Sequence, residues 1–197
     1  IIGKISVMRD SETGNHLIRV GEYSRIIAKY LRKSEKFQYI IRYAAPLHDI
    51  GKIGIDDSIL KKNGKLSDEE YEIMKKHTII GYEFLKNLKS QFLRTGALIS
   101  LSHHERYDGS GYPYGIKGKE INIFARIVSV ADVFDALVSE RIYKDAWTLE
   151  EAFEEIKESS GKQFDPECVK AFSEGFSEIK EIFYKYNQEG VNNGRYL

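Results

Sequence analysis

The sequence contains very little cysteine and very little proline. A single cysteine, Cys168, stands among 197 residues. This excludes a disulfide framework within the chain and zinc sites built from several thiolates, and it favours a reducing, cytoplasmic location. Only three prolines occur, so few positions interrupt a long helix.

Net charge and long apolar runs are also missing. Thirty basic residues balance thirty acidic ones, which argues against bulk nucleic acid as a partner. A small basic pocket for one phosphodiester is still compatible with that balance. No apolar run approaches the roughly 20 residues of a membrane span, and no signal peptide is visible. The length and the 42% hydrophobic content predict a single globular domain.

Helical periodicity is present through most of the chain, whereas strand patterns are nearly absent. Ser67 with Glu70 and Thr148 with Glu151 are capping boxes, and Asp165 precedes a proline at a first helical position. We therefore expect a compact all-α domain of about eight to ten helices. The predicted helices cover residues 15–32, 36–48, 57–62, 67–77, 78–88, 91–104, 123–139, 148–161 and 166–187.

Histidines and carboxylates occur at or beside the predicted helices. The chain has only five histidines, and none lies in a tail: His16, His48, His77, His103 and His104. Histidine is the commonest metal ligand, and Asp49 directly follows one of them. Asp132 and Asp135 lie three residues apart in the most apolar helix, where a carboxylate is costly unless it is paired or bound to metal. Either of these two could be a ligand.

A further pair, Glu12 and His16, has the four-residue spacing that brings two ligands together on one helical turn. A buried histidine or aspartate taken singly is more often a hydrogen-bonded core residue or an ion-pair partner. The whole set favours a metal centre instead. Nitrogen and oxygen ligands suit iron, manganese, zinc, nickel or cobalt. Two or three adjoining metals would share a bridging hydroxide that attacks phosphorus in line.

One run of the sequence is much more specific than the others. Residues 103–113 read His-His-Glu-Arg-Tyr-Asp-Gly-Ser-Gly-Tyr-Pro, and residues 48–52 read His-Asp-Ile-Gly-Lys. Together they resemble the HD-GYP domain, a bacterial branch of the HD phosphohydrolase superfamily. The resemblance extends from about Glu12 to Lys144.

The resemblance implies a cyclic di-GMP phosphodiesterase, which hydrolyses this second messenger to linear pGpG and onward to GMP. It implies two or three divalent metal ions, iron in the first place and manganese as the alternative. The alternative function is a non-catalytic cyclic di-GMP receptor that signals by conformation or partner docking. Another HD-type phosphohydrolase, acting on a different nucleotide, is disfavoured by the complete glycine-tyrosine-proline loop.

The resemblance also assigns roles to individual residues. Asp49 would bridge the metals, Asp132 rather than Asp135 would be the ligand of the apolar helix, and Glu12 tilts the expectation from two metals toward three. Lys52 would assist the leaving group as the second catalytic residue, beside Asp49. The implied metal ligands are Glu12, His16, His48, Asp49, His77, His103, His104 and Asp132. The implied substrate-binding residues are Lys52, Gly109, Gly111, Tyr112, Arg141 and Lys144.

The expected domain organisation follows from the same residues. We expect residues 1–11 to end an incoming linker helix, residues 12–187 to form the catalytic domain, and residues 188–197 to be a flexible tail. The opening residues read as the middle of a protein, so an N-terminal sensor domain is expected on the full-length chain, and that helix could pair two copies into a homodimer. Asp56 and Ile142 stand where the family commonly has proline, which concerns loop rigidity and not metal binding.

Overall fold

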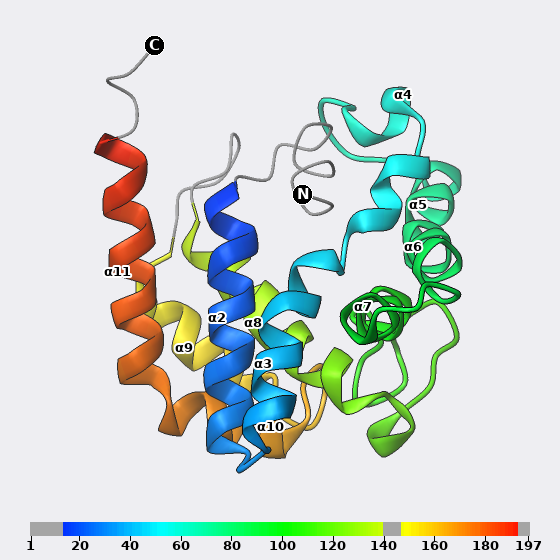
Figure 1. Cartoon of the computed structure of the whole chain (residues 1–197). Helices are drawn as coiled ribbons and strands as arrows, with labels where there is room; N and C mark the ends of the chain where they lie inside the picture. Colours follow the sequence, from blue (N-terminus) through cyan, green and yellow to red (C-terminus); the bar gives the residue numbers. More distant parts are fainter. Residues whose placement is uncertain (1–13, 140–146, 193–197) are drawn as a thin grey trace.

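The computed structural model describes residues 14–139 and 147–192, which form helices joined by short connections (Figure 1). Their bounds are α2 (Gly14–Tyr30), α3 (Glu35–Ala44), the 3-10 helices η1 (Ala45–Leu47) and η2 (Ile50–Gly54), α4 (Asp57–Leu60), α5 (Asp68–Lys75), α6 (His77–Leu85), α7 (Gln91–Ser102), η3 (Gly118–Glu120), α8 (Ile123–Val138), α9 (Leu149–Glu158), α10 (Pro166–Glu174) and α11 (Phe176–Asn192). Within these residues the β-type pairing is limited to an isolated bridge between Ser160 and Phe164. The predicted all-α fold is confirmed.

Side-chain caps begin several helices where the sequence predicts them. The Ser67 hydroxyl accepts a hydrogen bond from the backbone N–H of Glu70, and the Glu70 carboxylate accepts one from the N–H of Ser67. Thr148 and Glu151 form the second predicted capping box at the start of α9. Asp165 caps α10 by accepting from a backbone N–H in its first turn. Each cap satisfies amide groups that the helix itself cannot.

The prediction of one helix over residues 166–187 is wrong, because the chain breaks at Gly175 into α10 and α11. A Cβ atom at Gly175 would lie 2.7 Å from Cγ2 of Ile26 and 2.9 Å from Cδ2 of Tyr30. The break therefore lies where the chain passes in close contact with α2.

The helix predicted over residues 36–48 is also shorter than expected. It ends at Ala44, and the 3-10 helix η1 follows with Pro46 in its first turn. Proline has no N–H to donate to the helix and its ring crowds the carbonyl one turn earlier, so the α-helix cannot continue unchanged through it. This change of helix type sets the direction in which the next two residues, His48 and Asp49, project.

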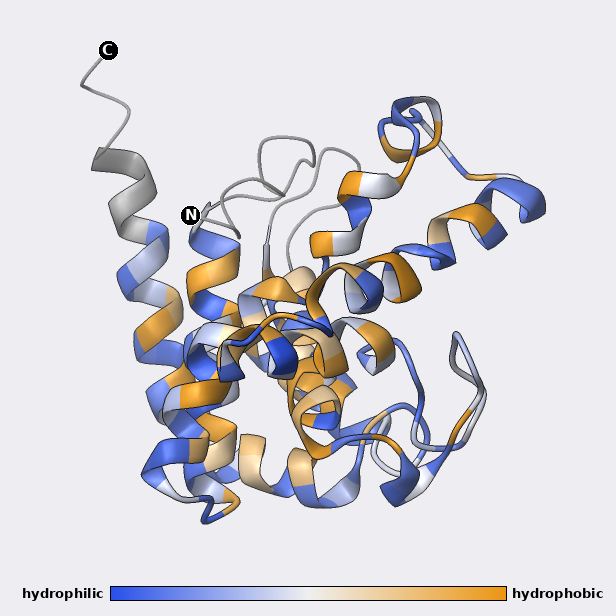
Figure 2. Ribbon diagram, turned by 45° about the vertical axis from the view of Figure 1, so that its right-hand side comes forward, coloured by the Kyte–Doolittle hydropathy of each residue, from blue (hydrophilic) through white to orange (hydrophobic). Residues whose placement is uncertain are grey.

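Two clusters of buried apolar residues hold the helices together. The larger cluster contains side chains such as Tyr23, Phe134 and Phe172 and joins the helices α2, α3, α7, α8, α9, α10 and α11. The smaller cluster lies between η1, η2, α6 and α7 and contains Leu47, Ile50, Leu85 and Ala97. Figure 2 shows apolar segments gathered in the middle of the molecule and hydrophilic ones along the outer helices. None of the described helices combines the length and the apolar character that a bilayer crossing requires.

Glycines allow η2 to cross the start of α6 at very short range. A Cβ atom on Gly51 would lie 1.9 Å from the carbonyl oxygen of His77 and 2.5 Å from the backbone nitrogen of Gly81. Since both obstacles are backbone atoms of a helix, no side-chain rotation can make room. This contact brings residue 49 close to residue 77.

We predict that Gly51→Ala destabilises the fold by about 1–3 kcal/mol or more, since the added methyl group must push η2 and α6 apart. Chemical denaturation would measure the change in the free energy of unfolding. Gly14→Ala is the matched control, because a Cβ atom there meets nothing within 4 Å. A Gly51→Ala protein as stable as the Gly14→Ala protein would contradict the explanation.

Candidate metal centre

The predicted ligand residues that the structure describes converge from five places in the fold. His16 comes from α2, His48 and Asp49 from the link between η1 and η2, and His77 from the first residue of α6. His103 and His104 directly follow α7, and Asp132 lies in the middle of α8. They form two groups, in each of which the ligand atoms lie within 4.8 Å of one another. The first half-site consists of Asp49, His77, His103 and His104, and the second half-site consists of His16, His48 and Asp132.

The carboxylate of Asp49 lies between the two half-sites. Its Oδ1 is 3.1 Å from Nε2 of His77 and 3.5 Å from Nε2 of His103. Its Oδ2 is 3.4 Å from Nε2 of His48, which belongs to the second half-site. In the second half-site, Oδ1 of Asp132 lies 3.5 Å from Nε2 of His48. One carboxylate thus faces imidazole nitrogens of both groups, which is the geometry of a bridging ligand.

The histidine rings are oriented by contacts at their other nitrogen. Nδ1 of His48 lies 2.9 Å from the carbonyl oxygen of Ala45, and Nδ1 of His77 lies 2.7 Å from that of Met74. Nδ1 of His103 lies 3.0 Å from the carbonyl oxygen of Ser100, whereas Nδ1 of His16 faces a carboxylate oxygen of Asp135 at 2.8 Å. A carbonyl or carboxylate oxygen accepts a hydrogen bond from the protonated Nδ1, which leaves the lone pair of Nε2 directed at the site.

Several ligand atoms are buried without a hydrogen bond among the described residues. These atoms include Nε2 of His77, Nε2 of His103 and Oδ1 of Asp49. Burying polar atoms without a partner is costly, and a bound cation would remove that cost. The donor set of imidazole nitrogens and carboxylate oxygens suits a divalent transition metal. The residues present therefore fit the divalent metal ions that the sequence predicts.

The electrostatics of the first half-site favour the metal-binding protonation states. Burial raises the pKa of the Asp49 carboxyl, but the charges of Lys52 and His48 outweigh burial and hold that pKa well below its usual range. Burial lowers the pKa of His103, and burial together with the charge of His103 lowers the pKa of His104 well below its ordinary value. The carboxylate is thus ionised and the two imidazoles are neutral near pH 7, as metal binding requires.

The geometry separates the two aspartates that the sequence left open. Asp132 Oδ1 faces His16 Nε2 at 3.7 Å and points into the second half-site. Asp135 faces the opposite nitrogen of His16 and is bound by Arg19 through Nε at 2.6 Å and Nη2 at 2.8 Å. This arrangement supports the assignment of Asp132 as the ligand. It gives Asp135 a supporting position behind His16.

Lys52 lies beside the carboxylate of Asp49, with its ammonium nitrogen 2.7 Å from Oδ2. The 18% exposed side chain lies at the border between the site and solvent. A cation at this position can meet negative charge that develops on a substrate oxygen.

The glycine loop after α7 folds back over the site. Gly109 has a φ of 87°, and a Cβ atom on Gly111 would lie 2.3 Å from the backbone nitrogen of Arg106. The ring of Tyr112 stacks on the imidazole of His104, with centroids 4.8 Å apart and an interplanar angle of 28°. The two glycines thereby allow the turn that sets Tyr112 against a predicted ligand.

Two residues that sequence reasoning missed support the site from behind. Glu105 is 3% exposed, and its Oε1 accepts a hydrogen bond from the N–H of Tyr114 at 2.8 Å, which ties down the glycine loop. Arg19 is 4% exposed and binds Asp135. A signal for Arg19 was available, because it lies three residues after His16 and shares its helix face. Three predicted site residues, Glu12, Arg141 and Lys144, lie outside the described residues.

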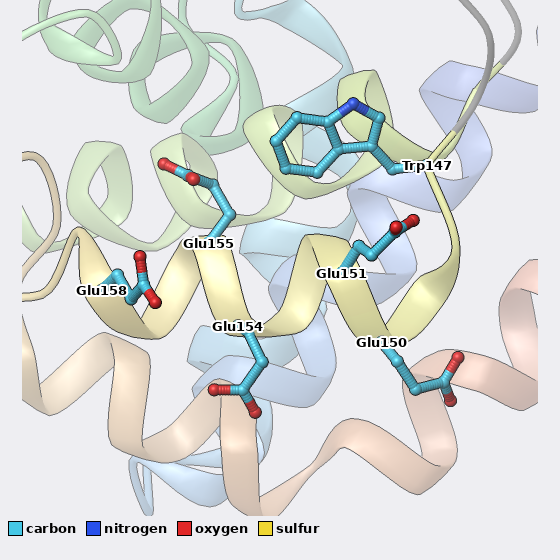
Figure 3. A pocket seen from close by; sticks show the side chains of 6 residues that line it. All are labelled: Trp147, Glu150, Glu151, Glu154, Glu155 and Glu158. Atoms are coloured by element: carbon cyan, nitrogen blue, oxygen red, sulfur yellow. The ribbon is translucent and has the colours of Figure 1, made fainter.

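A separate surface pocket runs along α9 (Figure 3). It is lined by Trp147, Glu150, Glu151, Glu154, Glu155 and Glu158. Its carboxylates already have local partners, since Glu151 caps the helix and Glu154 binds Lys157. The pocket contains none of the predicted ligands, and it is distinct from the metal centre.

Comparison with known proteins identifies the family to which this chain belongs. A family model described as "HD domain" matches residues 3–168. The chain belongs to the HD domain family. The family predicted from residues 48–52 and 103–113 is thereby confirmed, and within the HD domain the His-Asp pair is His48-Asp49.

The curated relatives of this HD domain are longer proteins. The chain is 51% identical to a "Cyclic di-GMP phosphodiesterase" of Thermotoga maritima, over 99% of this chain and 54% of the relative. It is 47% identical to the "Cyclic di-GMP phosphodiesterase response regulator RpfG" of Xanthomonas campestris, over 94% of this chain and 49% of the relative. The chain thus spans about half the length of these relatives.

A solved structure supports the fold. The crystal structure of a cyclic GMP-AMP specific phosphodiesterase of Vibrio cholerae superposes with a TM-score of 0.71 over 94% of this HD domain and 49% of that chain. The two sequences are 22% identical, so this likeness concerns the helical architecture alone.

We predict that Asp49→Asn lowers metal content more than His77→Ala, because the bridging carboxylate faces both half-sites and His77 faces one. Metal per chain would be measured by elemental analysis of protein purified without oxygen. Asp57→Asn serves as the control, because Asp57 is exposed in α4 and pairs with Lys61. Full metal content in the Asp49→Asn protein would exclude the bridging position.

Proposed function

We propose that this chain is the catalytic domain of a metal-dependent cyclic di-GMP phosphodiesterase, hydrolysing its substrate to pGpG and on to GMP. The observation that carries the proposal is the carboxylate of Asp49, which faces histidines of both half-sites, with Lys52 2.7 Å from the same carboxylate. Relatives 51% and 47% identical carry the name cyclic di-GMP phosphodiesterase, which supports this choice of substrate.

The proposed residue roles combine the resemblance to the HD-GYP domain with the geometry of the described residues. His16, His48, Asp49, His77, His103, His104 and Asp132 would hold two divalent ions, and Glu12 would add a ligand for a third. We propose iron, with manganese as the alternative, as the resemblance to the HD-GYP domain implies, and nitrogen and oxygen ligands are compatible with both metals. When bound, such ions polarise the phosphate and lower the pKa of the attacking water.

The protein's own groups would complete the displacement. Water adds to phosphorus as the bond to the ribose 3′ oxygen breaks, and the leaving oxygen takes up a proton. Lys52 is placed to stabilise the charge on that oxygen or to supply the proton. Arg141 and Lys144 would bind the phosphates, and Gly109, Gly111 and Tyr112 would form the nucleotide-facing loop. Because His104 covers one face of the Tyr112 ring, a guanine could stack only on the other face.

The setting of the domain is also proposed from the sequence. Cys168 is buried and free, which fits a reducing cytoplasm. An N-terminal sensor domain and a homodimer would place the activity under control of a signal. Size measurement of the full-length protein would test the dimer.

The decisive experiment measures metal content and nucleotide turnover on the same anaerobically purified protein. We expect two to three metal ions per chain, as the two half-sites with or without Glu12 imply, and formation of pGpG and GMP from cyclic di-GMP. A parallel assay with 3′3′-cGAMP is needed, because a relative named "3'3'-cGAMP-specific phosphodiesterase 2" is 43% identical over 88% of this chain and 33% of the relative. Full metal occupancy with tight cyclic di-GMP binding and no product would instead favour the receptor function.

We predict that Lys52→Ala lowers kcat for cyclic di-GMP by about 10²- to 10³-fold, because an electrostatic contribution to the transition state is lost. Metal content should stay at the parent level, since Lys52 is not a ligand. Lys76→Ala is the matched control, as Lys76 is an exposed lysine beside α6. An unchanged kcat in a fully metallated Lys52→Ala protein would remove Lys52 from the mechanism.

A further inference from the structure

His16 of the second half-site is held differently from three other histidines of the metal centre. His48, His77 and His103 direct Nδ1 at backbone carbonyl oxygens of the preceding turn, within 3.2 Å in every case. His16 directs Nδ1 at a side chain, the Oδ2 atom of Asp135, at 2.8 Å. A backbone carbonyl is fixed by the helix, whereas a carboxylate can rotate unless other groups restrain it.

Asp135 is restrained by a buried arginine. Arg19 donates from Nε to Oδ1 at 2.6 Å and from Nη2 to Oδ2 at 2.8 Å. Asp135 is 0% exposed and Arg19 is 4% exposed, so water does not compete for these hydrogen bonds. A two-point contact of this kind fixes the plane of the carboxylate as well as its position. Oδ2 of Asp135 therefore contacts both Nδ1 of His16 and Nη2 of Arg19.

Arg19 is itself held from two further elements. Its Nη2 donates to the hydroxyl of Ser139, the residue that follows α8, at 2.9 Å. Its Nη1 donates to Oδ1 of Asn187 on α11 at 3.1 Å. The guanidinium thus joins α2, the end of α8 and α11 behind one ligand of the metal centre.

We propose that Asp135, locked by Arg19, is a positioning residue that sets the metal affinity of the second half-site and leaves the first half-site unaffected. The proposal rests on the metal centre of the proposed function and names the group that tunes one half of it. A carboxylate behind a ligating histidine fixes the orientation and the tautomer of the ring and increases its basicity. Removal of such a partner commonly lowers metal affinity by about 10- to 100-fold.

A purely structural ion pair is the competing explanation, and the chain contains a matched example. Arg126 on α8 binds Asp165, the N-cap of α10, and the two side chains are 11% and 1% exposed. This pair is buried in a comparable way and joins helices, but neither residue contacts a predicted ligand in the described contacts. It therefore reports the cost of weakening a buried arginine–aspartate pair alone.

The test is a Mn²⁺ titration of the chelator-stripped 197-residue chain, with free Mn²⁺ followed by electron paramagnetic resonance. No nucleotide is present, so the result does not depend on phosphodiesterase activity. Asp135→Asn keeps the side-chain shape but leaves one acceptor oxygen where Arg19 and His16 use two. Arg19→Lys removes the two-point contact, and Arg126→Lys is the control. His16→Ala identifies the binding step that belongs to the second half-site.

We expect Asp135→Asn and Arg19→Lys to weaken the step identified by His16→Ala by about 10-fold or more, and the other step by less than about two-fold. Arg126→Lys should leave both steps unchanged. Equal weakening of both steps, no weakening, or the same pattern in Arg126→Lys would overturn the proposal. Circular dichroism and thermal unfolding accompany each titration, and Arg19→Lys decides the question if Asp135→Asn does not fold. Absence of turnover with a normal titration would instead count against the proposed function alone.

Discussion

The carboxylate of Asp49 is the constraint on which the rest of the site depends. It is 6% exposed, ionised, and surrounded by imidazole nitrogens of both half-sites. A buried charge of this kind is stable only where compensating groups surround it at short range. The crossing of η2 and α6 at Gly51, the end of α7 at His103 and the ammonium of Lys52 all bring such groups to it. The packing of these elements and the proposed chemistry therefore both depend on the side chain of Asp49.

Helix ends determine how the ligands are aimed. His77 begins α6, His103 follows α7, and His48 follows η1. Near a helix end, an imidazole can reach a carbonyl of the preceding turn while its other nitrogen projects outward. The backbone thereby selects the tautomer at three ligands. His16 lies inside α2, and its Nδ1 faces the side chain of Asp135, which orients the ring.

Much of the fold and site could be predicted because the signals are local. Capping boxes such as Ser67 with Glu70 mark helix starts, and the five histidines with Asp49 and Asp132 identified seven residues that the structure brings together. The break at Gly175 could not be predicted, since it depends on the close approach of α2, which lies much earlier in the sequence. Periodicity alone likewise left Asp132 and Asp135 open, because the group that separates them, Arg19, lies on another helix. Both features depend on long-range packing, which the periodicity of the sequence does not reveal.

The metal centre lies across the boundary between the two apolar clusters. His16 and Asp132 belong to helices of the larger cluster, whereas His77 and His103 belong to elements around the smaller one. The seam between these two separate groups of buried apolar side chains runs past α7, which contributes to both. A ligand set that spans this seam makes the two parts open together when cations are bound. Cation binding would then couple two local folding units into one cooperative unit.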